Sequence, residues 1–272
     1  MKNKTISILG GGWLGIPLAE SLEKSGYAVK ISTTSAAKHQ DLIARGKNAF
    51  QVNVRSKSVH GNAVPTFLEA DILIINITPN REELDQEQFA SLLPLIETSR
   101  IQKVLFVSST SVYPNVNRSV SEGEGIEIKT HHLYRSECFL SDNTHFETTV
   151  VRMAGLIGGE RHPGRFFRKS GWIKNGNAPV NLIHRVDCIN IIEQIIEQDA
   201  WGSTFNACSD THPLKKDFYP KAAKSIGLDA PKIDLKREGA FKMVDNQKLK
   251  KELQLTLNYP DLLVVLEKEY WI

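Results

Sequence analysis

The chain has 272 residues and a formal net charge of +3, and 41% of its residues are hydrophobic while 24% are charged. This length and composition fit a globular protein with one large α/β domain, or a nucleotide-binding domain with a smaller lobe. The small net charge argues against nucleic acid as a partner, and no apolar stretch reaches the length of a membrane span.

The cysteine content indicates a reducing compartment. Cys138, Cys188 and Cys208 are odd in number and lack CxxC spacing, which argues against a disulfide framework or a zinc site. The first expected strand starts within a few residues of Met1 and leaves no room for a signal peptide. We therefore expect a cytoplasmic protein without a bound metal.

The first expected strand, Ile6–Leu9, runs directly into a glycine-rich turn with the spacing GxGxxG. Gly10 allows a tight turn, Gly12 allows a pyrophosphate to approach the backbone, and Gly15 allows the following helix to lie close to the strand. The N–H groups at the start of that helix favour an anion. The turn thus predicts a dinucleotide site, with Gly10, Gly12, Trp13, Leu14 and Gly15 as cofactor-binding residues.

Strands and helices alternate along the next part of the chain. The apolar run at 71–76 is typical of a strand that is covered on both faces. We expect further strands at 27–32, 49–54, 103–108 and 148–153, and helices at 38–45, 82–99 and 130–140. This alternation predicts an α/β fold with a Rossmann-type doubly wound parallel sheet.

The amino-acid composition changes after residue 153. Residues 155–181 are rich in Gly, Arg and Asn, and we expect loops and a short helix there. Further helices are expected at 187–198, 215–226, 245–253 and after Pro260, with one strand at 203–207. We predict a dinucleotide-binding domain at 1–153 and a smaller substrate-binding lobe at 154–272, in which residues near 182–207 pack back on the first domain.

The stretch after the second strand bears on the choice of cofactor. Dinucleotide folds often place an acid there to bind the ribose hydroxyls, but Ser32–Lys38 contains none. Hydroxyl groups and a cation suit a 2′-phosphate, so the sequence favours NADP over NAD, although Lys38 could also simply begin a solvated helix. Asn53 could contact the adenine edge or satisfy a turn. The predicted contacts beyond the glycine turn are Thr33, Thr34, Ser35, Lys38, Asn53 and Thr78.

The fifth strand ends in Ser-Ser-Thr-Ser-Val-Tyr-Pro at 108–114, and a second tyrosine, Tyr134, follows Tyr113 by 21 residues. Together with the segments 151–167, 180–187 and 258–260, this pattern resembles the extended short-chain dehydrogenase/reductases, that is, the NAD-dependent epimerase/dehydratase family. The GxGxxG spacing and the Gly-Glu-Arg-His-Pro-Gly-Arg segment are similar to the atypical branch of that superfamily. The resemblance covers nearly the whole chain.

The resemblance implies catalytic roles for three residues. Ser109 or Ser111 would orient the substrate oxygen, and Tyr134 would transfer the proton while hydride passes to or from the nicotinamide. A phenol has a pKa of about 10, so the family places a lysine four residues later to favour the phenolate. Here that position holds Cys138. Arg135 is adjacent to Tyr134 but would point off a different face of the helix, and Lys129 precedes the helix.

The second lobe offers a basic loop. Arg161, His162, Arg165 and Arg168 lie within eight positions among glycine and proline, a pattern that suits binding of a phosphate or carboxylate but also a solvated loop. We predict Arg161, His162 and Arg165 as substrate contacts. We expect a structural role for His184, a helix-capping role for Asp187, and diverging side chains at His131 and His132.

The motifs and the family resemblance lead to two candidate functions of different classes. The first is an NAD(P)-binding, epimerase/dehydratase-like oxidoreductase that acts on a nucleotide sugar or a similar hydroxylated anionic substrate. The second is a non-catalytic dinucleotide-binding sensor or regulatory protein that has lost the active-site lysine. A different enzyme on the same fold is also consistent with these residues. The resemblance implies a small-molecule partner and a possible homodimer.

Overall fold

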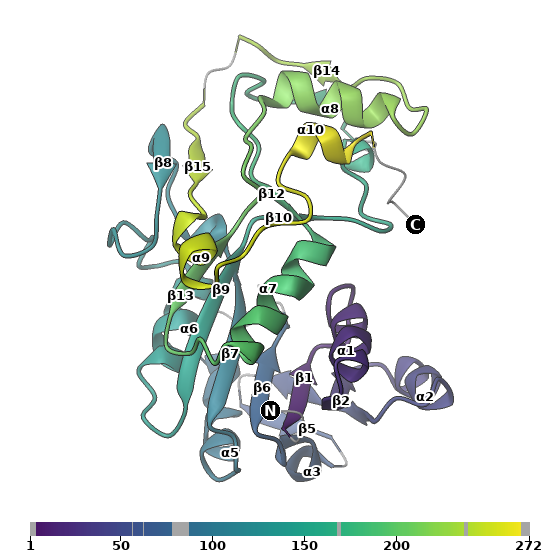
Figure 1. Cartoon of the computed structure of the whole chain (residues 1–272), viewed down its shortest axis with the longest axis vertical. Helices are drawn as coiled ribbons and strands as arrows, with labels where there is room; N and C mark the ends of the chain where they lie inside the picture. Colours follow the sequence, from purple (N-terminus) through teal and green to yellow (C-terminus); the bar gives the residue numbers. More distant parts are fainter. Residues whose placement is uncertain are drawn as a thin grey trace. The chain divides into compact units, whose positions relative to one another are not determined.

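The computed structural model describes residues 4–55, 57–61, 63–77, 87–167, 170–236 and 239–267. Its central element is a seven-stranded parallel sheet with the order β13-β9-β7-β6-β1-β2-β3 (Figure 1). From β1 the sheet extends through β2 and β3 on one side and through β6, β7, β9 and β13 on the other, which is the order of a doubly wound Rossmann-type sheet. The predicted fold class is confirmed. The strands are β1 (Thr5–Leu9), β2 (Ala28–Thr33), β3 (Ala49–Gln51), β6 (Ile72–Ile75), β7 (Lys103–Ser109), β9 (Glu147–Met153) and β13 (Thr204–Ala207).

The central strands form because their side chains are apolar on both faces. Ile6, Ile8 and Leu9 of β1 are buried, and so is every residue of β6. In the register of the sheet, Ile6 pairs with both Val29 of β2 and Ile72 of β6. A strand buried on both sides needs helices on both faces, which the crossover connections of a parallel sheet supply.

The chain forms two compact units. Unit 1 comprises Met1–Val112, Ile128–Val151 and Ile192–Thr204. Unit 2 comprises Tyr113–Glu127, Arg152–Ile191 and Phe205–Ile272. The chain therefore leaves unit 1 after Val112 and returns to it twice, at Ile128 and at Ile192.

Unit 1 carries helices whose buried side chains recur at helical spacing. In α1, Leu18, Ala19 and Leu22 are buried, and Gly26 with a positive φ of 90° ends the helix. The helices within this unit are α1 (Gly15–Lys24), α2 (Ala36–Ala44), α3 (Val64–Leu68), α4 (Glu87–Ala90), α5 (Leu93–Glu97) and α6 (His132–Ser141). None of the helices that the structure describes is long and apolar enough to span a membrane.

Two expectations for unit 1 were wrong. The single helix at 82–99 is two short helices, α4 and α5, because Pro94 lacks the N–H that a continuous helix needs and instead lies in the first turn of α5. Residues 82–86 of that expected helix lie outside the described ranges. The strand expected at 49–54 ends at Gln51, and a separate strand, β4 (Asn53–Arg55), forms an antiparallel hairpin with β5 (Ser58–His60).

Unit 2 contains short paired strands where loops were expected at 155–181. Its strands are β8 (Arg118–Val120), β10 (Gly155–Ile157), β11 (Trp172–Ile173), β12 (Leu182–His184), β14 (Lys232–Ile233) and β15 (Lys242–Val244). They form the pairs β10–β12, β11–β14 and β8–β15. Such two- and three-residue strands carry too few side chains for a period-2 pattern to stand out in the sequence.

The apolar core of unit 2 is small. Ile157, Leu182, Phe218 and Leu262 form its centre, and Phe167 and Tyr259 pack at its margin. The described helical segments that lie wholly within unit 2 are η2 (Pro163–Arg165), α8 (Lys215–Lys224), α9 (Gln247–Glu252) and α10 (Leu262–Val265). Helix α7 (Arg185–Glu197) begins in unit 2 and ends in unit 1.

A buried polar network supplements this core. Arg152 forms an ion pair with Glu127 at 2.6 Å, and both side chains are about 5% exposed. The same guanidinium donates to the Tyr113 hydroxyl at 2.5 Å, which in turn donates to Asn206 Oδ1 at 3.0 Å. Burial raises the pKa of Tyr113 to about 12, so at neutral pH the phenol keeps the proton that it donates.

The expectations for Asp187 and for the side chains of His131 and His132 were wrong. Asp187 does not cap α7; its buried carboxylate accepts N–H bonds from Asn258 and Tyr259, at 2.6 and 3.0 Å, and so anchors the C-terminal segment of unit 2. His131 and His132 do not diverge, because their rings stack with centroids 4.6 Å apart.

Candidate functional site

A cavity of about 600 Å³ opens at the carboxyl ends of β1, β2 and β6 in unit 1. Parallel strands direct their carboxyl ends to one edge of the sheet, so segments that are distant in sequence meet there. The cavity brings together most of the cofactor residues predicted from sequence: Gly10, Gly12, Thr33, Thr34, Ser35, Lys38 and Asn53.

The three glycines of the turn have different steric surroundings. A Cβ on Gly10, whose φ is +118°, would lie 2.4 Å from the carbonyl oxygen of Asn76. A Cβ on Gly15 would lie 2.1 Å from the carbonyl oxygen of Gly10. Gly12, in contrast, has no heavy atom within 4 Å of its ideal Cβ position. Gly10 and Gly15 therefore allow the turn to form, whereas Gly12 leaves open space that a phosphate group can occupy.

Hydrogen bonds hold this turn in place. The Gly10 N–H donates to Ser32 Oγ at 3.1 Å, the Gly11 N–H donates to the Ser32 carbonyl at 2.6 Å, and Asn76 Nδ2 donates to the Gly10 carbonyl at 3.2 Å. Helix α1 then begins without a side-chain cap and without an acidic residue in its first turn. Its N-terminus is therefore electrostatically suited to an anion.

The edge of the cavity formed by β2 and α2 is polar. Thr33 Oγ1 accepts the Ser35 N–H at 3.3 Å, and Ser35 Oγ accepts the Lys38 N–H at 3.3 Å as the N-cap of α2. Because both hydroxyls act as acceptors in these bonds, each retains its own proton for donation. Thr34 is exposed, and Lys38 is half-buried.

The structure adds Arg55 to this cavity, a residue that sequence reasoning missed. Arg55 ends β4 and so comes from a different stretch of the lining than Lys38. Of the described residues that line the cavity, Lys38 and Arg55 are basic and none is acidic. The usable sequence signal was a cation two positions after Asn53, but the sequence alone did not reveal that β4 turns into a hairpin at that point.

Trp13, Leu14 and Gly15, which the sequence also predicts as cofactor residues, are not among those that line the cavity. Leu14 is 3% exposed and belongs to the core, so its backbone alone is available to a ligand, and Trp13 is half-buried. Gly15 begins α1 and packs against Gly10. Thr78 lies outside the described residues.

The catalytic candidates lie where β7 ends and α6 begins, both within unit 1. Ser108 donates to Glu137 Oε1 at 2.5 Å, and both side chains are about 4% exposed, so this bond ties the end of β7 to α6. Ser109 is half-buried and its Oγ accepts the Ser111 N–H at 3.1 Å, whereas Ser111 is exposed. Tyr134 lies in the first turn of α6 and is half-buried.

Position 138 does not supply a cation to α6. Cys138 is half-buried, forms no disulfide and lies one turn after Tyr134. The neighbouring Glu137 is the buried residue bound to Ser108. The helix face that follows Tyr134 thus carries a carboxyl and a thiol where the resemblance implies an ammonium group.

The basic loop belongs to unit 2. Arg161 and Arg165 are exposed, but His162 is 2% exposed and its Nδ1 accepts the Gly164 N–H at 3.0 Å. Burial, with a further contribution from Arg165, lowers the pKa of His162 to about 4, so this ring is neutral at physiological pH. Arg168 lies outside the described residues.

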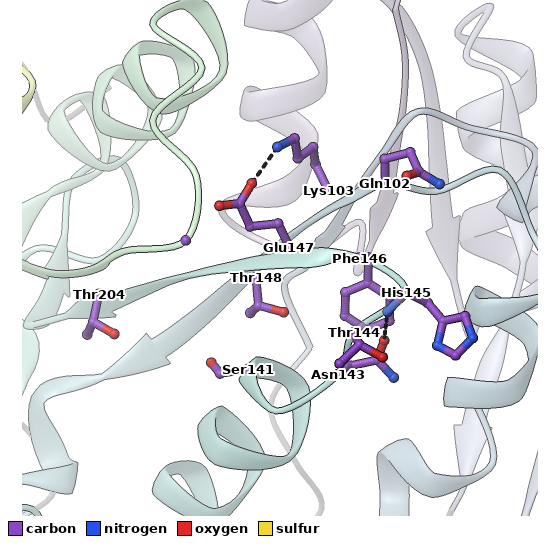
Figure 2. Close-up of a pocket in the computed structure, with 11 residues that line it drawn as sticks. Gln102, Lys103, Ser141, Asn143, Thr144, His145, Phe146, Glu147, Thr148 and Thr204 are labelled. Atoms are coloured by element: carbon purple, nitrogen blue, oxygen red, sulfur yellow. Dashed lines mark hydrogen bonds and ion pairs between the residues drawn. The ribbon is translucent and has the colours of Figure 1, made fainter.

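A second cavity, of about 560 Å³, lies in unit 1 at the amino ends of β7 and β9 (Figure 2). It contains the Lys103–Glu147 ion pair at 2.5 Å and the hydroxyls of Ser141 and Thr148. None of the residues predicted from sequence lines this cavity, and parallel strands present their cofactor edge at the opposite ends. We therefore assign the candidate site to the first cavity.

No family model matches the chain. It is 30% identical over 271 residues to Protein YeeZ of Escherichia coli strain K12, covering 96% of this chain and 98% of that protein.

Two solved structures share the fold. A short-chain dehydrogenase/reductase superfamily protein from Agrobacterium tumefaciens with bound NAD aligns with a TM-score of 0.75 at 15% identity, covering 97% of this chain and 95% of that chain. UDP-glucuronic acid 4-epimerase from Bacillus cereus in complex with NAD aligns with a TM-score of 0.75 at 18% identity, covering 98% and 97%. The short-chain dehydrogenase/reductase fold expected from the resemblance is confirmed.

Proposed function

This chain belongs to the family of the Escherichia coli protein YeeZ, and from that premise we propose that it is an NAD(P)-dependent oxidoreductase of the epimerase/dehydratase type that favours NADP. The observation that carries the proposal is the cavity at the carboxyl ends of β1, β2 and β6, which is open above Gly12 and has no acidic residue in its described lining. The NAD bound by the Agrobacterium and Bacillus proteins supports a nicotinamide dinucleotide as the ligand.

The residues of the cavity suit both the pyrophosphate and the 2′-phosphate of NADP. The open space at Gly12 and the uncapped N-terminus of α1 would hold the pyrophosphate. Thr33, Ser35 and Lys38 would hold a 2′-phosphate through two hydroxyl protons and one ammonium group. When bound, the nicotinamide would supply the hydride chemistry.

The proton chemistry would fall to residues of β7 and α6. We assign the proton transfer to the Tyr134 phenol, in the first turn of α6. Ser109 is a better candidate than Ser111 for orienting the substrate oxygen, because it is half-buried at the end of β7 while its Oγ, already accepting one N–H, keeps its proton. The substrate would be a nucleotide sugar or a similar hydroxylated anion. Arg161 and Arg165, which are exposed in unit 2, stay the sequence-based candidates for binding its anionic group.

A non-catalytic dinucleotide-binding protein is the second candidate, and Cys138 is the observation that favours it. A neutral thiol cannot favour the phenolate of Tyr134 as an ammonium group would. Such a protein would bind the cofactor in the same cavity and serve as a sensor or regulatory subunit. We propose a cytoplasmic location for either protein, which the absence of a disulfide among the three cysteines supports.

The test begins with binding. We expect the purified protein to quench or enhance the fluorescence of NADPH on titration, and to bind NADH at least tenfold more weakly, which corresponds to about 1.4 kcal/mol. Oxidation of bound NADPH is then followed against a panel of nucleotide sugars and small ketones. Tyr134→Phe should abolish turnover without changing the affinity for NADPH.

The outcomes separate the candidates. Lack of binding by either cofactor contradicts both functions. Turnover that survives in Tyr134→Phe contradicts the assignment of the proton donor. Binding without turnover in the natural chain, followed by turnover in Cys138→Lys, would establish the non-catalytic protein and an active site that has been lost.

A further inference from the structure

We infer that Arg55 determines cofactor specificity: together with Lys38 it forms a pair of cations that selects ligands phosphorylated on the adenosine ribose. The inference rests on the proposed dinucleotide site and adds to it a residue and a mechanism of selection. It is drawn from the two walls of the cavity in unit 1, which come from separate stretches of the chain.

The first wall is the β4–β5 hairpin. Asn53 pairs with His60, Val54 with Val59 and Arg55 with Ser58 in an antiparallel register. Val54 is buried and anchors the hairpin in unit 1.

The backbone of Arg55 is held from a second direction, because Ser91 Oγ donates to its carbonyl oxygen at 2.7 Å. The hairpin register and this bond fix the point from which the side chain extends, and Arg55 is one of the residues that line the cavity. A cation on a fixed backbone loses less conformational freedom when it binds a ligand than a cation on a free loop does.

The second wall is the end of β2 and the start of α2. It supplies the hydroxyls of Thr33 and Ser35, whose protons remain available, and the ammonium group of Lys38. Helix α2 has nine residues, so its N-terminus adds the positive end of a helix dipole at this wall.

Charge decides which ligand suits these walls. A phosphate monoester carries about −1.5 to −2 charges at pH 7, so two cations neutralise it where one would not. A guanidinium group can bind two phosphate oxygens at once, and the ammonium group adds a point charge. A 2′-hydroxyl, in contrast, is commonly bound by a carboxylate in this fold, and the described lining contains none.

A different role for Arg55 would be stacking of its guanidinium plane on the adenine ring. Stacking would act on phosphorylated and unphosphorylated adenosine alike, because both carry the same base. Selection by charge acts only on the phosphorylated form. The two roles therefore differ in a quantity that can be measured on cofactor fragments, without any turnover.

The experiment is isothermal titration calorimetry of the full chain with 2′,5′-ADP and with 5′-AMP, which differ only in the 2′-phosphate. We expect the natural chain to bind 2′,5′-ADP more tightly. Arg55→Gln should weaken 2′,5′-ADP by about 10- to 100-fold, the effect of one charge-assisted hydrogen bond, and should change 5′-AMP binding by less than about threefold. Arg55→Lys should restore part of the loss.

Arg45→Gln is the matched control. Arg45 follows α2, is about half exposed, forms an ion pair with Glu20 at 2.8 Å and does not line the cavity. This variant should bind both fragments as the natural chain does. Thermal unfolding of each variant checks that it is folded. If Arg55→Gln does not fold, the comparison of 2′,5′-ADP with 5′-AMP is made with Arg55→Lys.

Equal weakening of 2′,5′-ADP and 5′-AMP by Arg55→Gln would overturn the inference in favour of stacking. Unchanged binding of both fragments, or equal affinity of the natural chain for the two, would overturn it as well. If Arg55→Gln weakens both fragments equally or weakens neither, NADPH would still bind and the proposed function would stand. Equal affinity of the natural chain for the two fragments would also contradict the preference for NADP, but not the dinucleotide site itself. If the natural chain binds neither fragment and neither dinucleotide, the proposed function itself fails.

Discussion

Three histidines perform the same structural task. The Nδ1 atoms of His131, His162 and His184 accept the N–H groups two residues further on, of Leu133, Gly164 and Val186. A short polar side chain usually makes this bond at a helix start. His184 thus has the structural, hydrogen-bonded role expected from sequence, whereas a substrate contact by His162 stays a prediction that its neutral, buried ring does not favour.

These bonds predict a loss of stability in acid. Burial lowers the pKa values of His162 and His184 to about 4 in the folded protein, whereas an exposed imidazole in the unfolded chain has a pKa of about 6.5. Between these values the unfolded chain binds protons that the folded protein does not. The free energy of unfolding should therefore fall as the pH drops from 6.5 to 4, with a contribution of up to about 2.7 kcal/mol per pH unit from the two rings.

Urea unfolding at several pH values between 8 and 4.5 checks this expectation. His162→Asn keeps an acceptor for the Gly164 N–H but removes the ionisable ring. The variant should match the natural chain at pH 8, and its loss of stability down to pH 4.5 should be smaller by about 2–3 kcal/mol. An identical pH profile in the two proteins would contradict a neutral, buried His162.

The turn between β1 and α1 shows how one element separates folding from binding. Gly10 and Gly15 face backbone atoms at distances that no Cβ tolerates, while Gly12 faces open space. The same three-glycine spacing therefore contains positions with structural roles and one position reserved for a ligand. Sequence spacing predicts the motif, but only the surroundings of each Cβ separate the roles.

This separation can be tested with two alanine variants. Gly12→Ala should leave the free energy of unfolding within about 0.5 kcal/mol, because nothing opposes the added methyl group, but should weaken NADPH at least about tenfold by filling the phosphate space. Gly15→Ala should cost about 3 kcal/mol of stability, because its methyl group meets the Gly10 carbonyl. Thermal unfolding and fluorescence titration measure both quantities. Tight NADPH binding by a folded Gly12→Ala would exclude this position as the pyrophosphate site.

At the scale of the molecule, the two units are stabilised differently. Unit 1 is built on strands with apolar side chains on both faces, whereas unit 2 adds the buried network of Arg152, Glu127, Tyr113 and Asn206 to a small apolar core. A buried ion pair is costly to break, because the remaining partner keeps its charge in a poorly solvated place.

Arg152→Met should therefore destabilise the protein by about 3–5 kcal/mol. The control is Arg118→Met in the same unit, which breaks an exposed ion pair with Glu124 and should cost about 0–1 kcal/mol. Adding Glu127→Gln to Arg152→Met should recover part of the loss, since it removes the stranded carboxylate. Chemical denaturation measures all three, and a loss below 1 kcal/mol in Arg152→Met would contradict a structural role for the pair.

The amino-acid sequence by itself determined the sheet class, most strands and helices, and the glycine turn. These features depend on the periodicity of apolar residues, on the Gly and Pro residues that end helices and strands, and on the absence of a side chain at single positions. The tertiary structure alone decided what depends on distant partners. Asp187 anchors Asn258 instead of capping its own helix, the expected helix at 82–99 gives way to α4 and α5 where it is described, and the β4–β5 hairpin brings Arg55 to the cofactor cavity. Such pairings join residues far apart in the chain, and no local pattern records which of them meet.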